Sequence, residues 1–249
     1  MIVSLPLLAA LAGATLATSF VSGILGMAGG MMLLGVLLSA LPVPAAMALH
    51  GVTQLASNGG RAFLLRREID LRVLGGYVLG GLAALGVFAL AHVVLGKAGV
   101  LIAMGLAPFA GLALPERLHL NVERRGHSFA CGLACVSLAL TAGVAGPLLD
   151  VFFVRSGMTR HRVVATKAAT QTFGHLLKIV YFGRLVRGAE GGLDAAVVAL
   201  MVAAAVCGTA ASGKALERMS DRAFRTWTRR VIMTLGAVYL ATGVHALRG

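Results

Sequence analysis

The sequence predicts an all-α, polytopic membrane protein, and three observations support this class. The chain of 249 residues is 58% hydrophobic and 12% charged, with a mean hydropathy of +0.89, whereas a soluble domain carries about 25% charged residues. Long apolar stretches recur along the whole chain, each close to the length that crosses a bilayer. Alternation of period two is absent. Because backbone groups in lipid must bond internally, helices are the expected spanning element.

The second half of the chain repeats the plan of the first at an offset of 117 residues. Residues 1–120 are expected to form a Gly-broken segment at about 5–42 and helices at about 44–66, 71–95 and 97–115. Residues 121–249 are expected to form a Gly-broken segment at about 126–155 and helices at about 160–183, 192–214 and 230–247. Each broken segment is either a re-entrant hairpin or a pair of short helices. The two halves form one membrane domain.

The breaks contain small residues at similar positions: Gly26, Gly29 and Gly30 in the first, and Gly143, Gly146 and Pro147 in the second. Apolar segments interrupted by Gly or Pro at matching positions of two halves indicate the binding site of a secondary transporter. The N–H groups that open the half-helix after each break direct partial positive charge into the membrane. The site is therefore expected to favour an anion.

Two expected helices carry matching polar stripes. The first stripe is His50, Thr53, Gln54, Ser57, Asn58 and Arg61, and the second is Lys167, Thr170, Gln171, Gly174, His175 and Lys178. The spacing i, i+3, i+4, i+7, i+8, i+11 places each set on one helix face. Ionisable side chains inside a membrane are costly, so we interpret the two faces as a site.

The inner part of the stripes is expected to bind the anion. Lys supplies positive charge, while Thr and Gln supply donors that replace the water the anion loses. The expected ligands are His50, Thr53, Gln54, Asn58, Lys167, Thr170, Gln171 and His175. The alternative is that Thr and Gln only join helices, which would not require a Thr-Gln pair at equal positions in both halves.

Arg61, Lys178 and Asp150 are interpreted as pathway or coupling residues. Arg61 and Lys178 lie toward one end of their helices, either as cationic vestibules or as side chains that snorkel to the headgroups. Asp150 is the only acidic residue inside an apolar segment. Three roles are open for it: a proton carrier, a fixed partner of Lys167, or a residue at the mouth of the hairpin.

Basic residues predict the orientation of the halves. Most lie in four segments, at 66–72, 117–125, 155–162 and 214–230. The positive-inside rule places all four in the cytoplasm. The first stripe helix then runs inward and the second outward, so the halves are inverted. The net charge of +13 thus reflects topology, and we expect a multi-pass protein of the cytoplasmic membrane rather than a nucleic-acid binder.

Several motifs resemble those of the sulfite exporter TauE/SafE family. They are Gly26-Met27-Ala28-Gly29-Gly30, residues 45–53, Arg67-Glu68-Ile69-Asp70, and residues 143–147 followed by 165–171. The resemblance covers nearly the whole chain. It departs from the family pattern after the first break, where Met31 and Gly35 replace a common Gly and Pro. The resemblance implies transport of sulfite, sulfoacetate or similar sulfur-containing or organic anions.

We therefore expect a secondary transporter that works by alternating access around a midplane site between the halves. Its expected partners are a small anion and the lipid bilayer, and homo-oligomers are left open. The sequence contains no nucleophile constellation and no metal or cofactor motif, so we expect no enzyme, metal or cofactor. The alternatives are an anion channel and a membrane sulfur-transfer protein that uses Cys131, Cys135 or Cys207.

Overall fold

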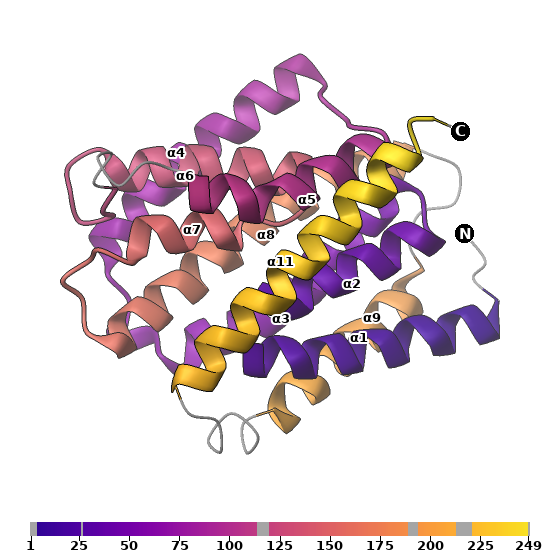
Figure 1. The fold of residues 1–249 in the computed structure, drawn as a ribbon, viewed down its shortest axis with the longest axis horizontal. Helices are drawn as coiled ribbons and strands as arrows, with labels where there is room; N and C mark the ends of the chain where they lie inside the picture. The colour runs from indigo at the N-terminus through magenta and orange to yellow at the C-terminus, as the bar shows by residue number, and fades with distance from the viewer. Residues whose placement is uncertain (1–3, 26, 114–119, 189–193, 213–220, 249) are drawn as a thin grey trace.

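The structure is a computed structural model that describes residues 4–25, 27–113, 120–188, 194–212 and 221–248. All regular elements in these ranges are helical (Figure 1), which confirms the predicted all-α class for this part of the chain. The helices are α1 (Leu5–Leu25), α2 (Met27–Ala40), α3 (Val43–Leu64), η1 (Arg66–Glu68), α4 (Leu71–Ala91), α5 (Lys97–Ala113), α6 (His127–Thr141), α7 (Gly146–Phe153), α8 (Arg160–Gly188), α9 (Ala195–Ala211) and α11 (Asp221–His245).

The helices differ in length from several sequence-based expectations. Helices α1 and α4 are long and apolar enough to cross a membrane, while α2, α6 and α9 are shorter apolar helices. Helix α8 continues to Gly188 instead of ending near 183, and α11 begins at Asp221 instead of near 230. Helix α7 has 8 residues. At 1.5 Å per residue it spans about 12 Å, far less than a hydrocarbon core of about 30 Å.

Four helix pairs provide most of the packing: α3 with α8, α4 with α6, α1 with α9, and α5 with α11. Each pair joins a helix of the first half to one of the second. The described α-helices of the two halves can be matched in chain order, α1 to α5 with α6, α7, α8, α9 and α11. Exchanging the halves then leaves the set of four pairs unchanged. This is the symmetry of pairing that a duplicated chain is expected to show.

The matched helices α3 and α8 run antiparallel. His50, in the first part of α3, contacts Lys178 in the second part of α8, whereas Arg61 near the end of α3 lies around one cavity with Lys167. Helices α5 and α11 are antiparallel too, because Gly105 packs on Leu240 and Gly243 packs near Ala98 and Ile102. If the two halves are inverted, a helix that packs against the matching helix of the other half must run antiparallel to it, as α3–α8 and α5–α11 do.

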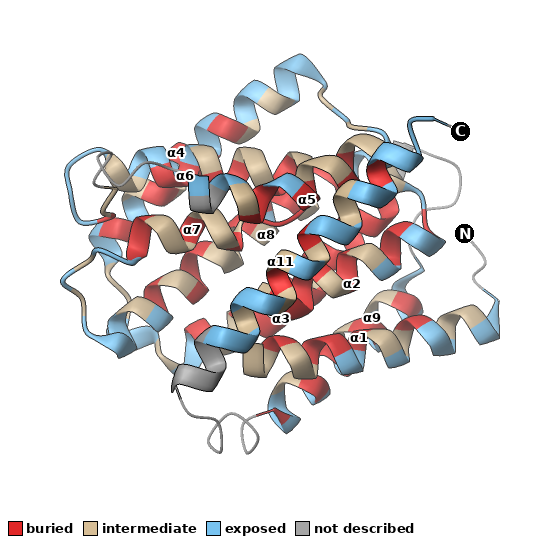
Figure 2. Ribbon diagram, viewed as in Figure 1, coloured by how far each residue is buried: buried red, intermediate tan, exposed pale blue. Residues whose placement is uncertain are grey.

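Buried residues lie on the inward-facing sides of the helices, as the colouring of Figure 2 shows. Most of α2 between Ala28 and Leu38 is buried. The outward faces of α4 and α11 instead expose large apolar side chains such as Leu79, Val87 and Val238. Exposed apolar faces of this kind are typical of helices that contact lipid or a partner surface.

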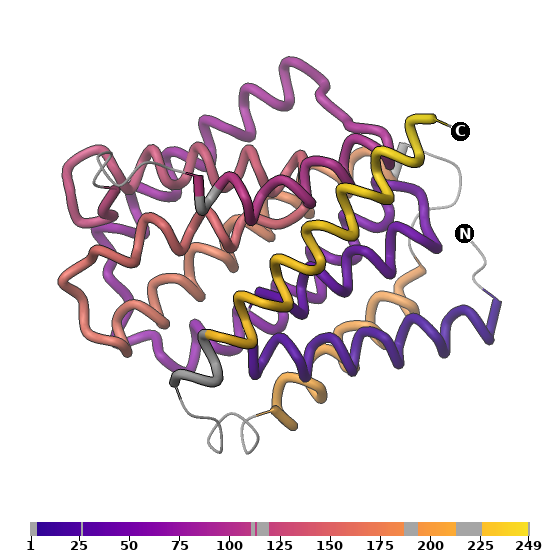
Figure 3. Tube along the Cα trace, in the orientation of Figure 1, coloured from indigo at the N-terminus to yellow at the C-terminus, as the bar shows by residue number. Residues whose placement is uncertain are grey.

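The described parts of the basic segments lie at one end of the bundle, on the left in Figure 3, and α1 begins and α11 ends at the opposite end. Arg162 donates to the Asp70 carboxylate at 2.8 Å, which joins the first turn of α8 to the residue before α4. Asn121 donates to the Arg155 carbonyl at 2.9 Å and joins two further loops. The start of α11 reaches the end of α1 through a hydrogen bond from Thr228.

Helix α6 packs directly on the backbone of α4 at Gly132, where a methyl group would overlap main-chain atoms of Tyr77. At Gly86 on α4, no atom would lie within 4 Å of such a methyl group. We predict that Gly132→Ala lowers the Tm in detergent, because overpacking reduces the free energy of unfolding by about 1–3 kcal/mol. The control Gly86→Ala should leave the Tm unchanged or raise it, because Ala is favoured over Gly in a helix by about 0.5–1 kcal/mol. Equal Tm values for Gly132→Ala and Gly86→Ala would contradict the close contact between α4 and α6.

Asp70 caps α4 and titrates with a shifted pKa. Its carboxylate accepts the N–H groups of Arg72 and Val73 at 3.0 and 3.1 Å, besides the Arg162 guanidinium. Burial acts to raise the pKa of Asp70, but the hydrogen bonds from Val73 and Arg162 outweigh it and hold the pKa below its ordinary 3.8. The stabilisation is therefore present above about pH 4 and is lost as the pH falls through the lowered pKa.

We predict that Asp70→Ala destabilises the protein by about 1 kcal/mol at pH 7, the usual cost of losing an N-cap. The difference in Tm between parent and variant should narrow at pH 3, because protonation weakens the cap in the parent. Asp70→Asn is the control: it keeps a good capping side chain and loses only the exposed ion pair, which contributes little. If the Tm difference between the parent and Asp70→Ala were as large at pH 3 as at pH 7, the role of the carboxylate charge would be contradicted.

Candidate functional site

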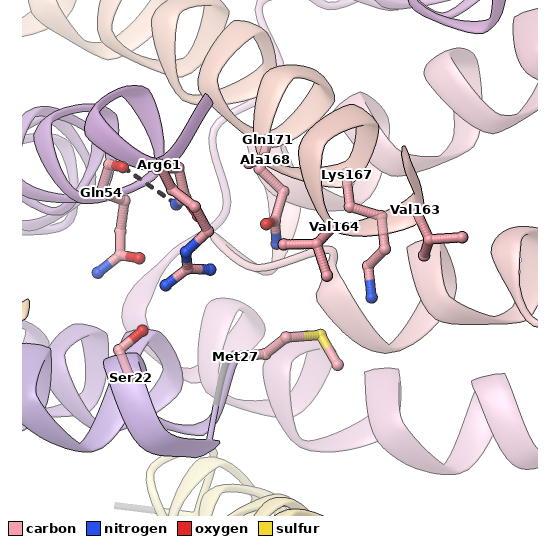
Figure 4. Close-up of a pocket in the computed structure, with 10 residues that line it drawn as sticks. Ser22, Met27, Gln54, Arg61, Val163, Val164, Lys167, Ala168 and Gln171 are labelled. Atoms are coloured by element: carbon pink, nitrogen blue, oxygen red, sulfur yellow. Dashed lines mark hydrogen bonds between the residues drawn. The ribbon is translucent and has the colours of Figure 1, made fainter. Parts of the chain in front are cut away.

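We call the helix pair α1–α2 the first hairpin and the helix pair α6–α7 the second hairpin. A cavity of about 180 Å³ lies between the first hairpin and the two stripe helices α3 and α8 (Figure 4). It is lined by Ser22 of α1, Met27 of α2, and eight residues of α3 and α8: Gln54, Asn58, Arg61, Val163, Val164, Lys167, Ala168 and Gln171. Half of these eight, the two glutamines with Asn58 and Lys167, are expected anion ligands. Arg61 is an expected pathway residue.

The side chains of Gln54, Arg61, Lys167 and Gln171 point into the same space, with Ser22 on the facing helix (Figure 4). The stripe spacing explains this convergence, since it keeps the polar residues of α3 on one side and those of α8 on the side that faces it. The structure thus brings together, from two helices far apart in sequence, two cationic groups and two primary amides.

The described charges at the cavity sum to a positive value. The Lys167 ammonium binds the carboxylate of Asp150 on α7, and Asp150 is partly exposed. The Arg61 guanidinium forms no ion pair with any residue that the structure describes. Guanidinium and amide groups in such a wall offer several N–H donors to a small oxyanion. Of the three roles open for Asp150, the contact with Lys167 is the one visible in the structure.

A second polar cluster lies deeper between α3 and α8 and is closed to solvent. Lys178 has no exposed surface. Its ammonium donates to Nδ1 of His50 at 2.7 Å and to the carbonyl of Gly143 at 2.9 Å. Nε2 of His50 lies 2.9 Å from the carbonyl of Gly30, so this nitrogen carries the donated proton. The cluster therefore joins both stripes to both hairpins.

The expectation that Lys178 lies near a helix end, in a vestibule or at the headgroups, is wrong. Helix α8 continues to Gly188, so Lys178 is an interior residue of the helix. Its partner Gly143 lies in the turn between α6 and α7 with φ of 74°, a left-handed conformation that glycine adopts without strain. A helix break thus supplies the carbonyl that solvates the buried ammonium.

The two stripe threonines do not line the cavity. Thr53 and Thr170 are fully buried, and each hydroxyl donates at 2.9 Å to a carbonyl of its own helix, at His50 and Lys167 respectively. The two bonds join equal positions of the two halves. In this structure the threonine hydroxyls are used within the helices, whereas the glutamines and Asn58 reach the cavity.

His175 lies beside the buried cluster. Its ring meets that of His50 edge to face, with centroids 5.7 Å apart and planes at 68°. Its Nδ1 is shielded from solvent and has no hydrogen-bond partner among the described residues. His175 occupies the stripe position that Asn58 occupies in the first half, and Asn58 lines the cavity.

The residues of the two glycine-rich breaks lie at the hairpins. Gly29 and Gly30 belong to α2, Gly143 to the α6–α7 turn, and Gly146 and Pro147 to the first turn of α7. Gly26 lies outside the described residues. Met27, two residues before Gly29 in α2, packs against Gly146, so the two hairpins touch each other beside the cavity.

Sequence reasoning missed half of the cavity wall. Val164 lies at i−3 from Lys167 and Ala168 at i−3 from Gln171, so the helical period could have identified them. Ser22 and Met27 carry no comparable signal, because their positions depend on how the first hairpin folds back on α3. The cysteines are not part of the wall: Cys131 and Cys135 are buried with sulfur atoms 3.9 Å apart, and Cys207 is exposed. Within the described ranges, no group of three His, Cys, Asp or Glu residues could hold a metal ion.

An apolar helical bundle that encloses a cationic cavity between duplicated helices belongs to the class of membrane transporters. A family model described as "Sulfite exporter TauE/SafE" matches residues 10–240, so the chain belongs to this family of membrane transporters and the sequence resemblance is confirmed. No curated protein and no solved structure gave a match.

Proposed function

We propose that the protein is a secondary transporter that moves sulfite, sulfoacetate or similar small sulfur-containing or organic anions across the cytoplasmic membrane by alternating access. One observation carries the proposal: cationic and amide side chains from two matched, antiparallel helices line a single cavity. Membership of the sulfite exporter family supports the class of substrate.

The cavity fits a small oxyanion in size and chemistry. A single water needs about 10–15 Å³ of cavity volume, so a cavity of about 180 Å³ has room for a small anion together with water. The guanidinium of Arg61 can bind two oxygens of a sulfite or sulfonate group at once. The amides of Gln54 and Gln171 can donate to a further oxygen. The anion is expected to compete with Asp150 for the Lys167 ammonium.

The proposed topology places the basic end in the cytoplasm and inverts the two halves. The antiparallel pairing of α3 with α8 and the gathering of the basic segments at one end support it. The cavity lies on that side: Val164 at its rim is 38% exposed, whereas His50 and Lys178 on the other side are at most 1% exposed. The structure then represents a state open toward the cytoplasm.

We predict that Lys167→Met lowers the initial rate of sulfite counterflow in proteoliposomes by tenfold or more. Loss of a hydrogen bond to a charged group costs about 1.5–3 kcal/mol, which corresponds to roughly ten- to a hundredfold. The control Arg66→Met removes an exposed cation outside the cavity wall and should transport like the parent. Unchanged counterflow in Lys167→Met would remove this residue from the site, and parent flux without saturation or counterflow would indicate a channel.

We predict that replacing Cys131, Cys135 and Cys207 together by Ala leaves sulfite counterflow within twofold of the parent, because none of them lines the cavity. The Tm is expected to fall, since two of the three side chains are buried. A folded triple variant that transports less than a tenth as fast as the parent would favour the sulfur-transfer alternative.

A further inference from the structure

The cavity and the buried cluster use the same two stripe positions. Arg61 and Lys178 are separated by 117 residues, and so are His50 and Lys167. We call Arg61 with Lys167 the cavity pair, and His50 with Lys178 the deep pair. Because α3 and α8 are antiparallel, exchanging the two halves converts one pair into the other.

The two pairs are in different states. The deep pair is closed, with Lys178 bonded to His50 and to the carbonyl of Gly143 in the second hairpin. The cavity pair is open, and it lies beside Met27 in the first hairpin. Equivalent stripe positions are therefore paired twice along the α3–α8 contact, once sealed and once accessible.

The chemistry of the deep pair also points to an anion. Lys178 forms no ion pair within the described residues, and its partners there are a neutral imidazole acceptor and a carbonyl. A buried ammonium without an opposite charge is costly. Beside it, Nδ1 of His175 is shielded and unpartnered. An oxyanion could accept from the Lys178 ammonium and from an N–H of the His175 imidazole together.

We propose that His50, Lys178 and His175 form a second anion-binding position, which opens toward the side opposite the basic end when the cavity pair closes. This inference rests on the proposed transport function and specifies the residues of its other state. Gln54 and Gln171 lie between the two pairs along α3 and α8, so the anion would keep their amides in both states.

The α3–α8 contact is suited to such an exchange. The hydroxyls of Thr53 and Thr170 bond within their own helices and form no hydrogen bond across the contact. Among the described residues, the hydrogen bond that directly joins a side chain of α8 to a side chain of α3 is the bond from Lys178 to His50. Release of Lys178 from His50 would remove the hydrogen bond that joins the two helices at this end, a step that the proposed exchange requires.

The test compares Lys178→Met with Lys167→Met, two variants that lose an ammonium from the two positions. Sulfite binding is measured from the ligand-induced rise in Tm of the purified protein, because a ligand stabilises the state that binds it. Sulfite counterflow in proteoliposomes measures the full cycle. For Lys178→Met we expect a sulfite Kd within threefold of the parent and a counterflow rate at least tenfold lower. Lys167→Met should lose both binding and counterflow.

Two results would overturn the second position: Lys178→Met that transports like the parent, or a folded Lys178→Met that no longer binds sulfite. A purely structural role would lower the Tm and weaken binding and transport together. If the parent neither binds sulfite nor shows counterflow, the proposed function itself fails, and the two failures are thereby distinguished.

A second experiment does not remove Lys178 and applies even if Lys178→Met does not fold. A methyl group at Gly51 would press on the side chain of Ile179 next to the deep pair, whereas one at Gly60 meets no atom within 4 Å. The reporter is a cysteine-free protein that carries Val164→Cys at the cavity and is labelled by an impermeant maleimide from the cytoplasmic side. Gly51→Ala should push the two helices apart at the deep pair and thereby close the cavity, so it should lower labelling at least threefold. Gly60→Ala should not change it. Equal labelling in both variants would contradict the exchange.

Discussion

The antiparallel packing of α3 against α8 determines the rest of the site. The two helices carry the same stripe, but antiparallel contact places each residue opposite a different position of the other copy. In a parallel arrangement each residue would face its own counterpart, Arg61 facing Lys178 and His50 facing Lys167. In the observed arrangement Lys178 meets His50, and Arg61 shares a cavity with Lys167. The antiparallel direction thus makes the two pairs, at opposite ends of one contact, counterparts of each other.

The hairpins supply what the stripe helices lack. A buried ammonium and a buried imidazole each need a hydrogen-bond acceptor. The carbonyl of Gly143, in the turn between α6 and α7, accepts from Lys178, and the carbonyl of Gly30, near the start of α2, accepts from His50. The glycine-rich breaks and the polar stripes are therefore parts of one structure. The contact between Met27 and Gly146 brings the two hairpins together around it.

Periodicity was sufficient to predict the all-α class and most polar residues of the cavity, because the face of a helix follows from spacing alone. It could not predict which residues are free to bind. Thr53 has the correct face, yet its hydroxyl bonds to its own backbone, an alternative open to any helical threonine. Nor could it place Lys178, because polar residues such as Arg184 suggest an earlier helix end, and burial depends on partners from distant segments. The inverted orientation of the halves remains a proposal that the antiparallel pairing supports.

The differences between the halves suggest why the two closed states are not equivalent. Closing the deep pair joins Lys178 to a histidine that serves as a neutral acceptor. Closing the cavity pair brings together Arg61 and Lys167, and two unit charges 4 Å apart repel by about 4 kcal/mol at an effective dielectric constant of 20. A negative group must lie between them, either the carboxylate of Asp150 or the bound anion. Asp150 has no acidic counterpart in the first half, where Leu33 occupies the matched position. The empty protein should therefore rest open at the cavity pair, and the substrate itself should supply the charge that allows this side to close.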